Sequence, residues 1–133
     1  MTRRSIQLAA MVTMMGLALA TRVAAHHSSA AAYDSSKTVE TQGTVTQVLL
    51  KNPHTFIFVE STDEAAAQKV QWQIEMQAAA TLFSQGWTKE TVKPGMVIKV
   101  SGIPSRPPGS HGITNARLAL PDGTPIGRAT GAN

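Results

Sequence analysis

The chain has 133 residues, with 12 Lys and Arg, 8 Asp and Glu and no cysteine. Without cysteine it has no disulfide, no thiolate metal site and no lipid-modified cysteine anchor. Arg3, Arg4 and Arg22 lie in an N-terminal segment that we expect to be removed, which leaves nine basic residues against eight acidic ones. The charge therefore gives no support to nucleic-acid binding.

Residues 1–25 have the pattern of a secretory signal peptide. A basic start at Arg3 and Arg4 precedes an apolar run over residues 6–20, and Val23-Ala24-Ala25 offers small residues for cleavage. The run is too short for a stable membrane span, so we expect none in the mature form. We predict a bacterial protein that is periplasmic or secreted after cleavage near Ala25. The start also resembles a twin-arginine signal, so that route and general secretion both stay open.

The rest of the chain divides by composition into three parts. Residues 26–37 are small and polar without periodicity, which predicts a flexible N-terminal arm. Residues 38–123 carry the patterns of regular structure and form the predicted domain, which is long enough to enclose one hydrophobic core. Residues 124–133 are rich in Gly and Thr, so we expect a frayed tail.

The stretch from residue 43 to residue 60 predicts the first hairpin of a small β-barrel. Residues 38–51 and 54–60 have the composition of strands. Between them Asn52-Pro53-His54 forms a rigid corner, because proline fixes its own φ and restricts the residue before it. The apolar phase shifts beside Gly43, which predicts a bulge or a bend. The second strand is apolar on both faces, as expected of a strand that is covered on each side.

Later segments complete the predicted barrel. Residues 69–75 alternate as a strand, residues 76–87 change to helical spacing with Gly86 as a C-cap, and residues 96–103 and 113–120 are strands again. Lys93-Pro94-Gly95 has the residues of a type II turn. This order matches the OB-fold, a mainly β, closed five-stranded barrel with one short helix between strands 3 and 4. An open sheet with one helix is the alternative.

Several motifs of the chain occur together in one family. They are His26-His27-Ser28, Gly43-Thr44-Val45, Asn52-Pro53-His54, Gly86-Trp87-Thr88, Lys93-Pro94-Gly95, Asn115-Ala116-Arg117 and Leu120-Pro121-Asp122-Gly123. In this set the chain resembles a family of small exported bacterial proteins known only as a domain of unknown function. The resemblance implies an exported single-domain β-barrel and brings no activity with it. Many members carry an aromatic residue soon after His-His-Ser, where this chain has Ser29 and Ala30.

All four histidines lie in loops or at the very start of a predicted strand: His26, His27, His54 and His111. In an OB-fold the loops between strands 1 and 2 and between strands 4 and 5 border one binding face. We therefore expect His54 and His111 near each other, with ligand-binding loops that include Asn52, Pro53 and Ser110. Among divalent ions, copper binds nitrogen sites most tightly. A free amine at His26, or a chelate that begins at Ala25, would add nitrogen ligands, so the sequence predicts a copper-type metal site.

The same residues also have purely structural interpretations. His54 can cap the Asn-Pro corner by hydrogen bonding, and His111 can be solvated in its Pro-, Gly- and Ser-rich loop. The His26-His27 pair can simply suit the signal peptidase. The large aromatic residues are expected in the core rather than in a stacking platform: Phe56, Phe58 and Trp72.

Catalysis has little support in the sequence. The serines of the arm have no positioned base, and the chain has no nucleophile elbow. Residues 109–112 lack the Lys and the helix of a phosphate-binding loop. We expect no enzyme, with a copper oxidase built on a histidine brace as a distant alternative. The predicted function is an exported protein that binds a copper-type ion or a small ligand. The alternative is a metal-free binding module for a protein or an envelope component.

Overall fold

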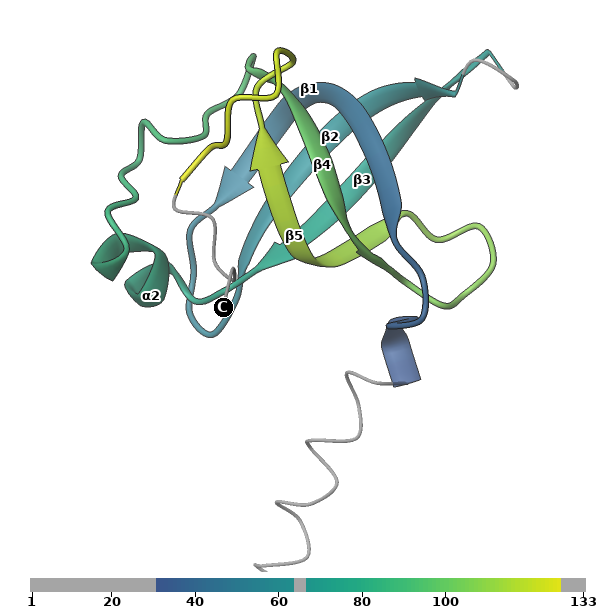
Figure 1. Ribbon diagram of the computed structural model, residues 1–133, viewed down its shortest axis with the longest axis horizontal. Coiled ribbons are helices and arrows are strands. Elements are labelled where there is room, and N and C mark those ends of the chain that lie inside the picture. The colour runs from purple at the N-terminus through teal and green to yellow at the C-terminus, as the bar shows by residue number, and fades with distance from the viewer. Residues whose placement is uncertain (1–30, 64–66, 128–133) are drawn as a thin grey trace, which may run out of the picture. The chain divides into compact units, whose positions relative to one another are not determined.

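The computed structural model describes residues 31–63 and 67–127. The chain divides into two compact units, Met1–Ala32 and Tyr33–Asn133. The predicted signal peptide and the predicted site residues His26 and His27 lie outside the described residues. The second unit forms a closed barrel of five strands in the order β1-β2-β3-β5-β4 (Figure 1).

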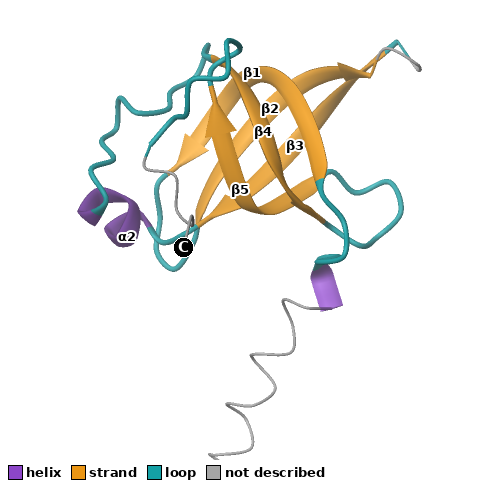
Figure 2. Ribbon diagram, in the orientation of Figure 1, coloured by secondary structure: helices purple, strands orange, loops and turns teal. Residues whose placement is uncertain are grey.

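The order of the elements is the one that the sequence predicts for an OB-like barrel. Figure 2 shows the helix labelled α2 outside the strands of the barrel. The bounds are β1 Val39–Leu49, β2 Thr55–Asp63, β3 Gln68–Met76, α2 Ala79–Ser84, β4 Val97–Pro104 and β5 Gly112–Ala119. The predicted fold class, a mainly β closed barrel with a helix between the third and fourth strands, is confirmed.

The barrel closes because β1 pairs with two partners and β3 pairs with β5. β1 runs antiparallel to β4 through its first half and to β2 through its second half. The β3–β5 pairing is parallel and short, from Gln73 opposite Gly112 to Glu75 opposite Thr114. β2 and β3 pair along their whole length, from Thr55 opposite Met76 to Asp63 opposite Gln68. This hairpin extends past the rest of the barrel (Figure 1).

The bend of β1 depends on two adjacent features. A Cβ atom on Gly43 would overlap the carbonyl oxygen of Glu60, so only glycine allows β1 to pass this close to β2. The register with β2 then shifts between Val45 and Gln47, which makes Thr46 the extra residue of a β-bulge. The sequence predicted a bulge beside Gly43, and the structure has the close approach there and the bulge three residues later.

Inward-facing side chains of all five strands fill the barrel. The buried core cluster is Val45, Ile57, Val59, Ile74, Leu82, Trp87, Val92, Ile98, Val100, Ile113 and Leu118. Thr55 is the buried polar residue of the described chain, with 0% exposure, and its Oγ1 has no hydrogen-bond partner among the described residues. A buried hydroxyl without a partner destabilises the fold, because it gives up water and gains nothing in return.

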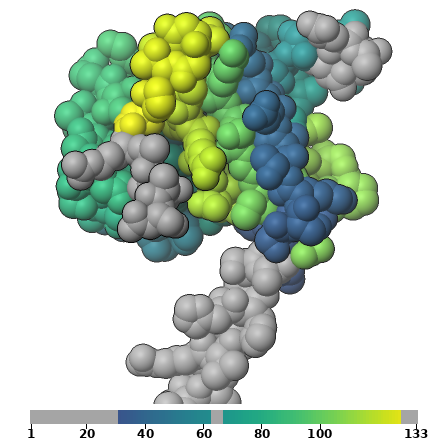
Figure 3. All heavy atoms as spheres, in the orientation of Figure 1, coloured from purple at the N-terminus to yellow at the C-terminus, as the bar shows by residue number. Residues whose placement is uncertain are grey.

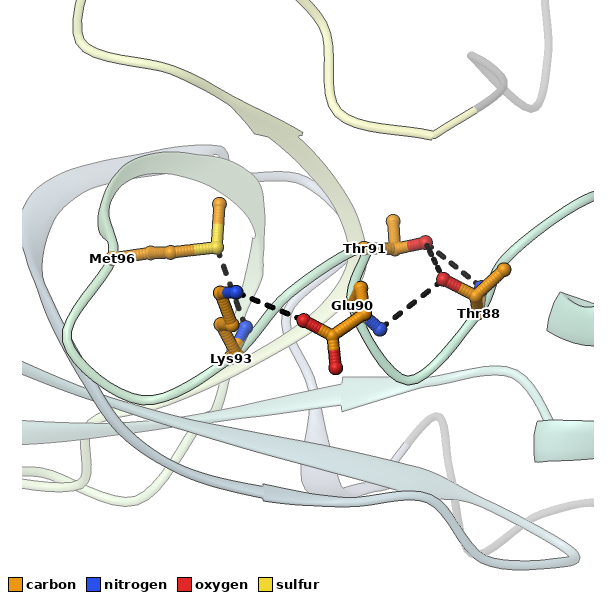
Figure 4. A network of polar contacts seen from close by, with 5 residues as sticks. All are labelled: Thr88, Glu90, Thr91, Lys93 and Met96. Atoms are coloured by element: carbon orange, nitrogen blue, oxygen red, sulfur yellow. Dashed lines mark hydrogen bonds and ion pairs between the residues drawn. The ribbon is translucent and has the colours of Figure 1, made fainter.

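α2 and the segment that follows it close one side of the barrel. The helix is shorter than the predicted residues 76–87, and it contributes Leu82 to the core, whereas Phe83 is exposed. After it, Thr91 Oγ1 accepts from the Thr88 amide, and Lys93 Nζ lies 2.9 Å from Glu90 Oε2 (Figure 4). The predicted turn at residues 93–95 is present, since Gly95 has φ +91° and the amide of Met96 donates to Lys93.

The segment after β5 also packs on the barrel. The amide of Ile126 donates to the carbonyl oxygen of Leu118, and the Ile126 side chain packs against the core. A Cβ atom on Gly127 would overlap the indole of Trp87. Figure 3 shows this segment, in yellow, beside the green segment between α2 and β4. The predicted tail is thus held in place from Thr124 to Gly127 rather than frayed.

Candidate functional site

The outer surface of β2 carries two aromatic side chains. Thr55, Ile57 and Val59 are all 0% exposed and face inward, so the alternating Phe56 and Phe58 face outward. Neither belongs to the core cluster or to the partly buried residues that pack against it. The prediction that both phenylalanines are core residues was wrong, because a continuous apolar run does not show which face is inside.

Polar side chains of the neighbouring strands flank this aromatic pair. Phe56 lies opposite Leu49 of β1 and Glu75 of β3, and Phe58 lies opposite Gln47 and Gln73. Together with Gln71, which follows the same phase of β3, these outward side chains form what we call the β2–β3 face: Gln47, Leu49, Phe56, Phe58, Gln71, Gln73 and Glu75. The face therefore has an aromatic centre, with an amide and a leucine on the β1 side and amides and a carboxylate on the β3 side.

An open pocket of about 310 Å³ lies at one end of this face. Its lining is polar and carries no permanent charge: Tyr33, Gln71, Gln73, Ser105, Ser110, His111 and Gly112. Gly112 allows Ser105 to approach closely, because a Cβ atom there would lie 3.0 Å from Ser105 Oγ and 3.8 Å from Tyr33 Cε1. The β4–β5 loop thus contributes to the pocket, as the sequence predicted for the loop that contains Ser110.

Tyr33 brings the end of the N-terminal arm to this site. Its backbone bridges to Ser105, and the amide of Asp34 donates to the carbonyl oxygen of Pro104. Its hydroxyl donates a short hydrogen bond to Glu75 Oε2. Burial, with the hydrogen bond and negative charge of Glu75, raises the pKa of Tyr33 well above its ordinary value. The phenol is therefore neutral at physiological pH.

His54 reaches the same carboxylate from the β1–β2 corner. Its Nδ1 lies 2.9 Å from Glu75 Oε1, and its side chain is 51% exposed. Asn52 has a different role, since its Oδ1 accepts from the Ala80 amide at the start of α2. The Asn52–Pro53 bond is cis, and both residues are exposed. Of the three corner residues, only the histidine points its side chain to the β2–β3 face.

His111 has a different neighbour on β3. Its ring packs edge-on against Trp72, with 5.0 Å between the ring centroids and 66° between the planes. The Trp72 indole in turn donates to Ser61 Oγ at 3.0 Å. Ser110 hydrogen-bonds Ser105 and the carbonyl oxygen of Pro107, which holds the β4–β5 loop in shape.

The structure brings His54 and His111 to the same strand but not to one cluster. Their partners, Glu75 and Trp72, are three residues apart on β3, a separation of about 10 Å along a strand. Within residues 31–63 and 67–127, no three His, Asp or Glu side chains gather as a metal-binding group. His26 and His27 lie outside these ranges, so the copper site stays a prediction.

Tyr33 and Glu75 were not among the predicted site residues, and neither were the outward side chains of the β2–β3 face. The outward phase of Glu75 is visible in the alternation of residues 69–75, but its contact with Tyr33 spans 42 positions. No local pattern predicts a contact of that range. The one available signal is that Tyr33 is the single tyrosine of the chain, placed in an otherwise small and polar arm.

Comparisons with known proteins agree with this architecture without adding an activity. The described part of the chain contains no helix with the length and apolarity to cross a membrane. No curated protein matches the sequence. A family model described as a family of unknown function, DUF6152, matches residues 15–115, which is more than half of the chain. The chain therefore belongs to DUF6152, a family of unknown function.

Proposed function

We propose that the protein is an exported binding module that holds a neutral, hydroxyl-rich glycan of the cell envelope on its β2–β3 face. The observation that carries the proposal is the outward position of Phe56 and Phe58 beside Gln73 and Glu75. Two residues apart on one strand, the Cα atoms of the two phenylalanines lie about 7 Å from each other, and both side chains are on the same surface. That spacing suits a chain of sugar rings.

The chemistry of the face fits sugars on two counts. The C–H faces of a pyranose ring pack on aromatic rings, so the phenylalanines provide apolar contact area. The amides of Gln47 and Gln73 both donate and accept, and the Glu75 carboxylate accepts from hydroxyl groups. The strand 2–3 face with its adjoining loops is also where OB-folds bind oligosaccharides, which supports the proposal by analogy only.

Charge argues against a polyanionic ligand. Of the charged side chains on β2 and β3 near the face, Glu60 and Glu75 are acidic, and the basic Lys69 is paired with Glu60 at 2.8 Å. A nucleic acid needs Lys and Arg along its backbone to neutralise the phosphates. A neutral glycan needs no such neutralisation.

Calorimetric titration with N-acetylglucosamine oligomers, together with co-sedimentation with purified cell-wall sacculi, tests the proposal. We expect Phe56→Ala and Phe58→Ala each to weaken binding by about tenfold, since stacking on an aromatic ring contributes on the order of 1–3 kcal/mol. Phe83→Ala is the matched control, because Phe83 is an exposed phenylalanine (43%) on α2, away from the face. Equal loss in all three variants, or no binding by the unaltered protein, would contradict the proposal.

A copper-type ion is the second candidate ligand, and the contact between His54 and Glu75 is the observation that favours it. Metal-binding histidines commonly donate one ring N–H to a carboxylate, which fixes the other nitrogen as the ligand. Glu75 holds Nδ1 of His54 in this way, so Nε2 is the nitrogen oriented for an ion. The other ligands would come from His26 or His27, because His111 does not cluster with His54 in the described part of the chain.

The copper candidate needs the processed chain, because an extra residue before His26 changes the amine ligand. N-terminal sequencing of the protein from the periplasmic fraction comes first, and it also tests export. Titration with copper(II) then follows. Tight one-to-one binding that His54→Ala abolishes would support the ion. Binding that survives in His54→Ala would exclude His54 as a ligand.

A further inference from the structure

We propose that the free edge of β3, at Lys69 and Gln71, binds an extended peptide segment of a partner protein as an additional strand. The surface is separate from the β2–β3 face, because it uses the backbone at the edge of the sheet and not the outward side chains. The proposal rests on strand register and on one hydrogen bond.

Among the described residues, part of the β2–β3 hairpin has no neighbouring strand. β1 follows β2 only as far as Thr44 opposite Glu60, and β5 meets β3 first at Gln73. Beyond these points, Ser61–Asp63 pair only with β3, and Gln68–Trp72 pair only with β2. The projection of this hairpin past the other strands is visible in Figure 1.

One hydrogen bond determines which backbone groups face outward. The amide of Gln73 donates to the carbonyl oxygen of His111 at 2.8 Å, so the backbone polar groups of Gln73 point away from β2 and toward β5. In an antiparallel pair this direction alternates with every residue. Gln71 and Lys69 therefore also direct their N–H and C=O groups to that side, where β5 has not yet begun. Both residues are exposed.

The position beside Lys69 and Gln71, which no described strand occupies, has the properties of a binding site for an added strand. It lies in line with β5 and ends at the pocket that Gln71, Gln73 and His111 border. Donors and acceptors that repeat every second residue match another polypeptide backbone, which is how β-strand addition gives affinity. Val70 and Trp72 are partly exposed on the inner side of the same segment, so apolar side chains at alternate positions of the peptide have a surface to contact.

The proposed occupant of this edge is a peptide segment of another protein, and the competing occupant is a second copy of this chain. Lys69 favours the first, because a charged residue on an open edge opposes pairing of two identical edges. In a symmetric antiparallel pair centred on Val70, two lysines would lie near each other across the axis. A peptide with no charge of that sign meets no such repulsion.

The test selects heptapeptides from a random phage-displayed library against the purified protein. Selected peptides are synthesised and titrated against variants that remove one outward N–H. Gln71→Pro deletes a donor of the proposed edge and leaves the β2–β3 hydrogen bonds in place. Thr62→Pro is the matched control, because Thr62 lies opposite Lys69 and points its N–H to the other edge of the hairpin. We expect at least a tenfold loss for Gln71→Pro and little change for Thr62→Pro.

A second measurement does not depend on the variants folding. Two sets of peptides, N-methylated at the odd or at the even positions, are titrated against the unaltered protein. Methylation should abolish binding in one set and leave it in the other. The proposal is overturned if the library yields no binding peptide, if both proline variants bind equally, or if both methylation patterns are tolerated. It is also overturned if sedimentation shows a dimer that Gln71→Pro dissociates, since the occupant is then a second copy.

Discussion

Nδ1 of His54 lies 2.9 Å from Oε1 of Glu75, and the other oxygen of this carboxylate accepts the hydroxyl hydrogen of Tyr33. A single side chain of β3 thus connects the β1–β2 corner with the end of the N-terminal arm. The three residues come from distant parts of the sequence, and the barrel is what brings them together. The arm, predicted to be flexible over residues 26–37, is held on the barrel at Tyr33.

Glu75→Gln should weaken this connection. The amide retains the shape of the side chain, but it loses the charge that both partners favour. We expect the free energy of unfolding to fall by about 1 kcal/mol, a small value because the pair is partly exposed. Glu60→Gln is the matched control, since the Glu60–Lys69 pair is solvent-exposed and should contribute less to stability. Urea denaturation of both variants measures the difference, and equal effects would contradict the assignment.

The ionisation of Tyr33 can be followed directly, because it is the single tyrosine of the chain. Its folded pKa is raised, so the neutral phenol stabilises the folded state. That contribution is fully present below the ordinary pKa of about 10 and is lost as the pH rises further. Absorbance at alkaline pH should show a late phenolate transition. Glu75→Gln should move the transition to lower pH, and an unshifted transition in the folded protein would refute the contact.

Gly43→Ala should be among the most damaging single substitutions. The new Cβ atom would overlap the backbone carbonyl of Glu60, which cannot move without breaking the β1–β2 pairing. We expect a loss of at least about 3 kcal/mol, or no folded protein. The control is Gly95→Ala, where φ is +91° but no atom lies within 4 Å of the added carbon. That variant should lose only about 1 kcal/mol from backbone strain. Thermal unfolding compares the two.

Thr55→Val should stabilise the barrel. The Thr55 hydroxyl is fully buried and has no partner among the described residues, and valine has nearly the same shape without it. Removing the unsatisfied group should raise the free energy of unfolding by about 1 kcal/mol. Thr46→Val serves for comparison, because Thr46 is exposed and its hydroxyl bonds Phe58 at 3.3 Å. A loss of stability in Thr55→Val would indicate a hydrogen-bond partner that the structure does not contain.

Much of the fold could be predicted because strand and turn signals are local. The alternation of residues 69–75, the Pro-Gly turn at residues 94–95 and the Asn-Pro corner each follow from short-range stereochemistry. The orientation of Phe56 and Phe58 could not be predicted, since their strand is apolar at every position from 56 to 59. The inner face is decided by which neighbours the strand acquires when the barrel closes.

The candidate site was predictable only in part. Ser110 and His111 border the pocket, whereas His54 and His111 contact different residues of β3. The partners of the histidines could not be inferred, because Glu75 and Trp72 are selected by cross-strand register and not by spacing in the sequence. Asn52 was expected in a ligand-binding loop, and its side chain contacts the start of α2.

The contact between Gly127 and Trp87 places a limit on how the chain can be shortened. A truncation after β5 would remove Ile126 from the core and uncover the indole ring that Gly127 touches. Expressed versions that end at residue 123 should therefore show red-shifted tryptophan fluorescence and melt at lower temperature. An affinity tag belongs beyond residue 133, with a spacer in front of it.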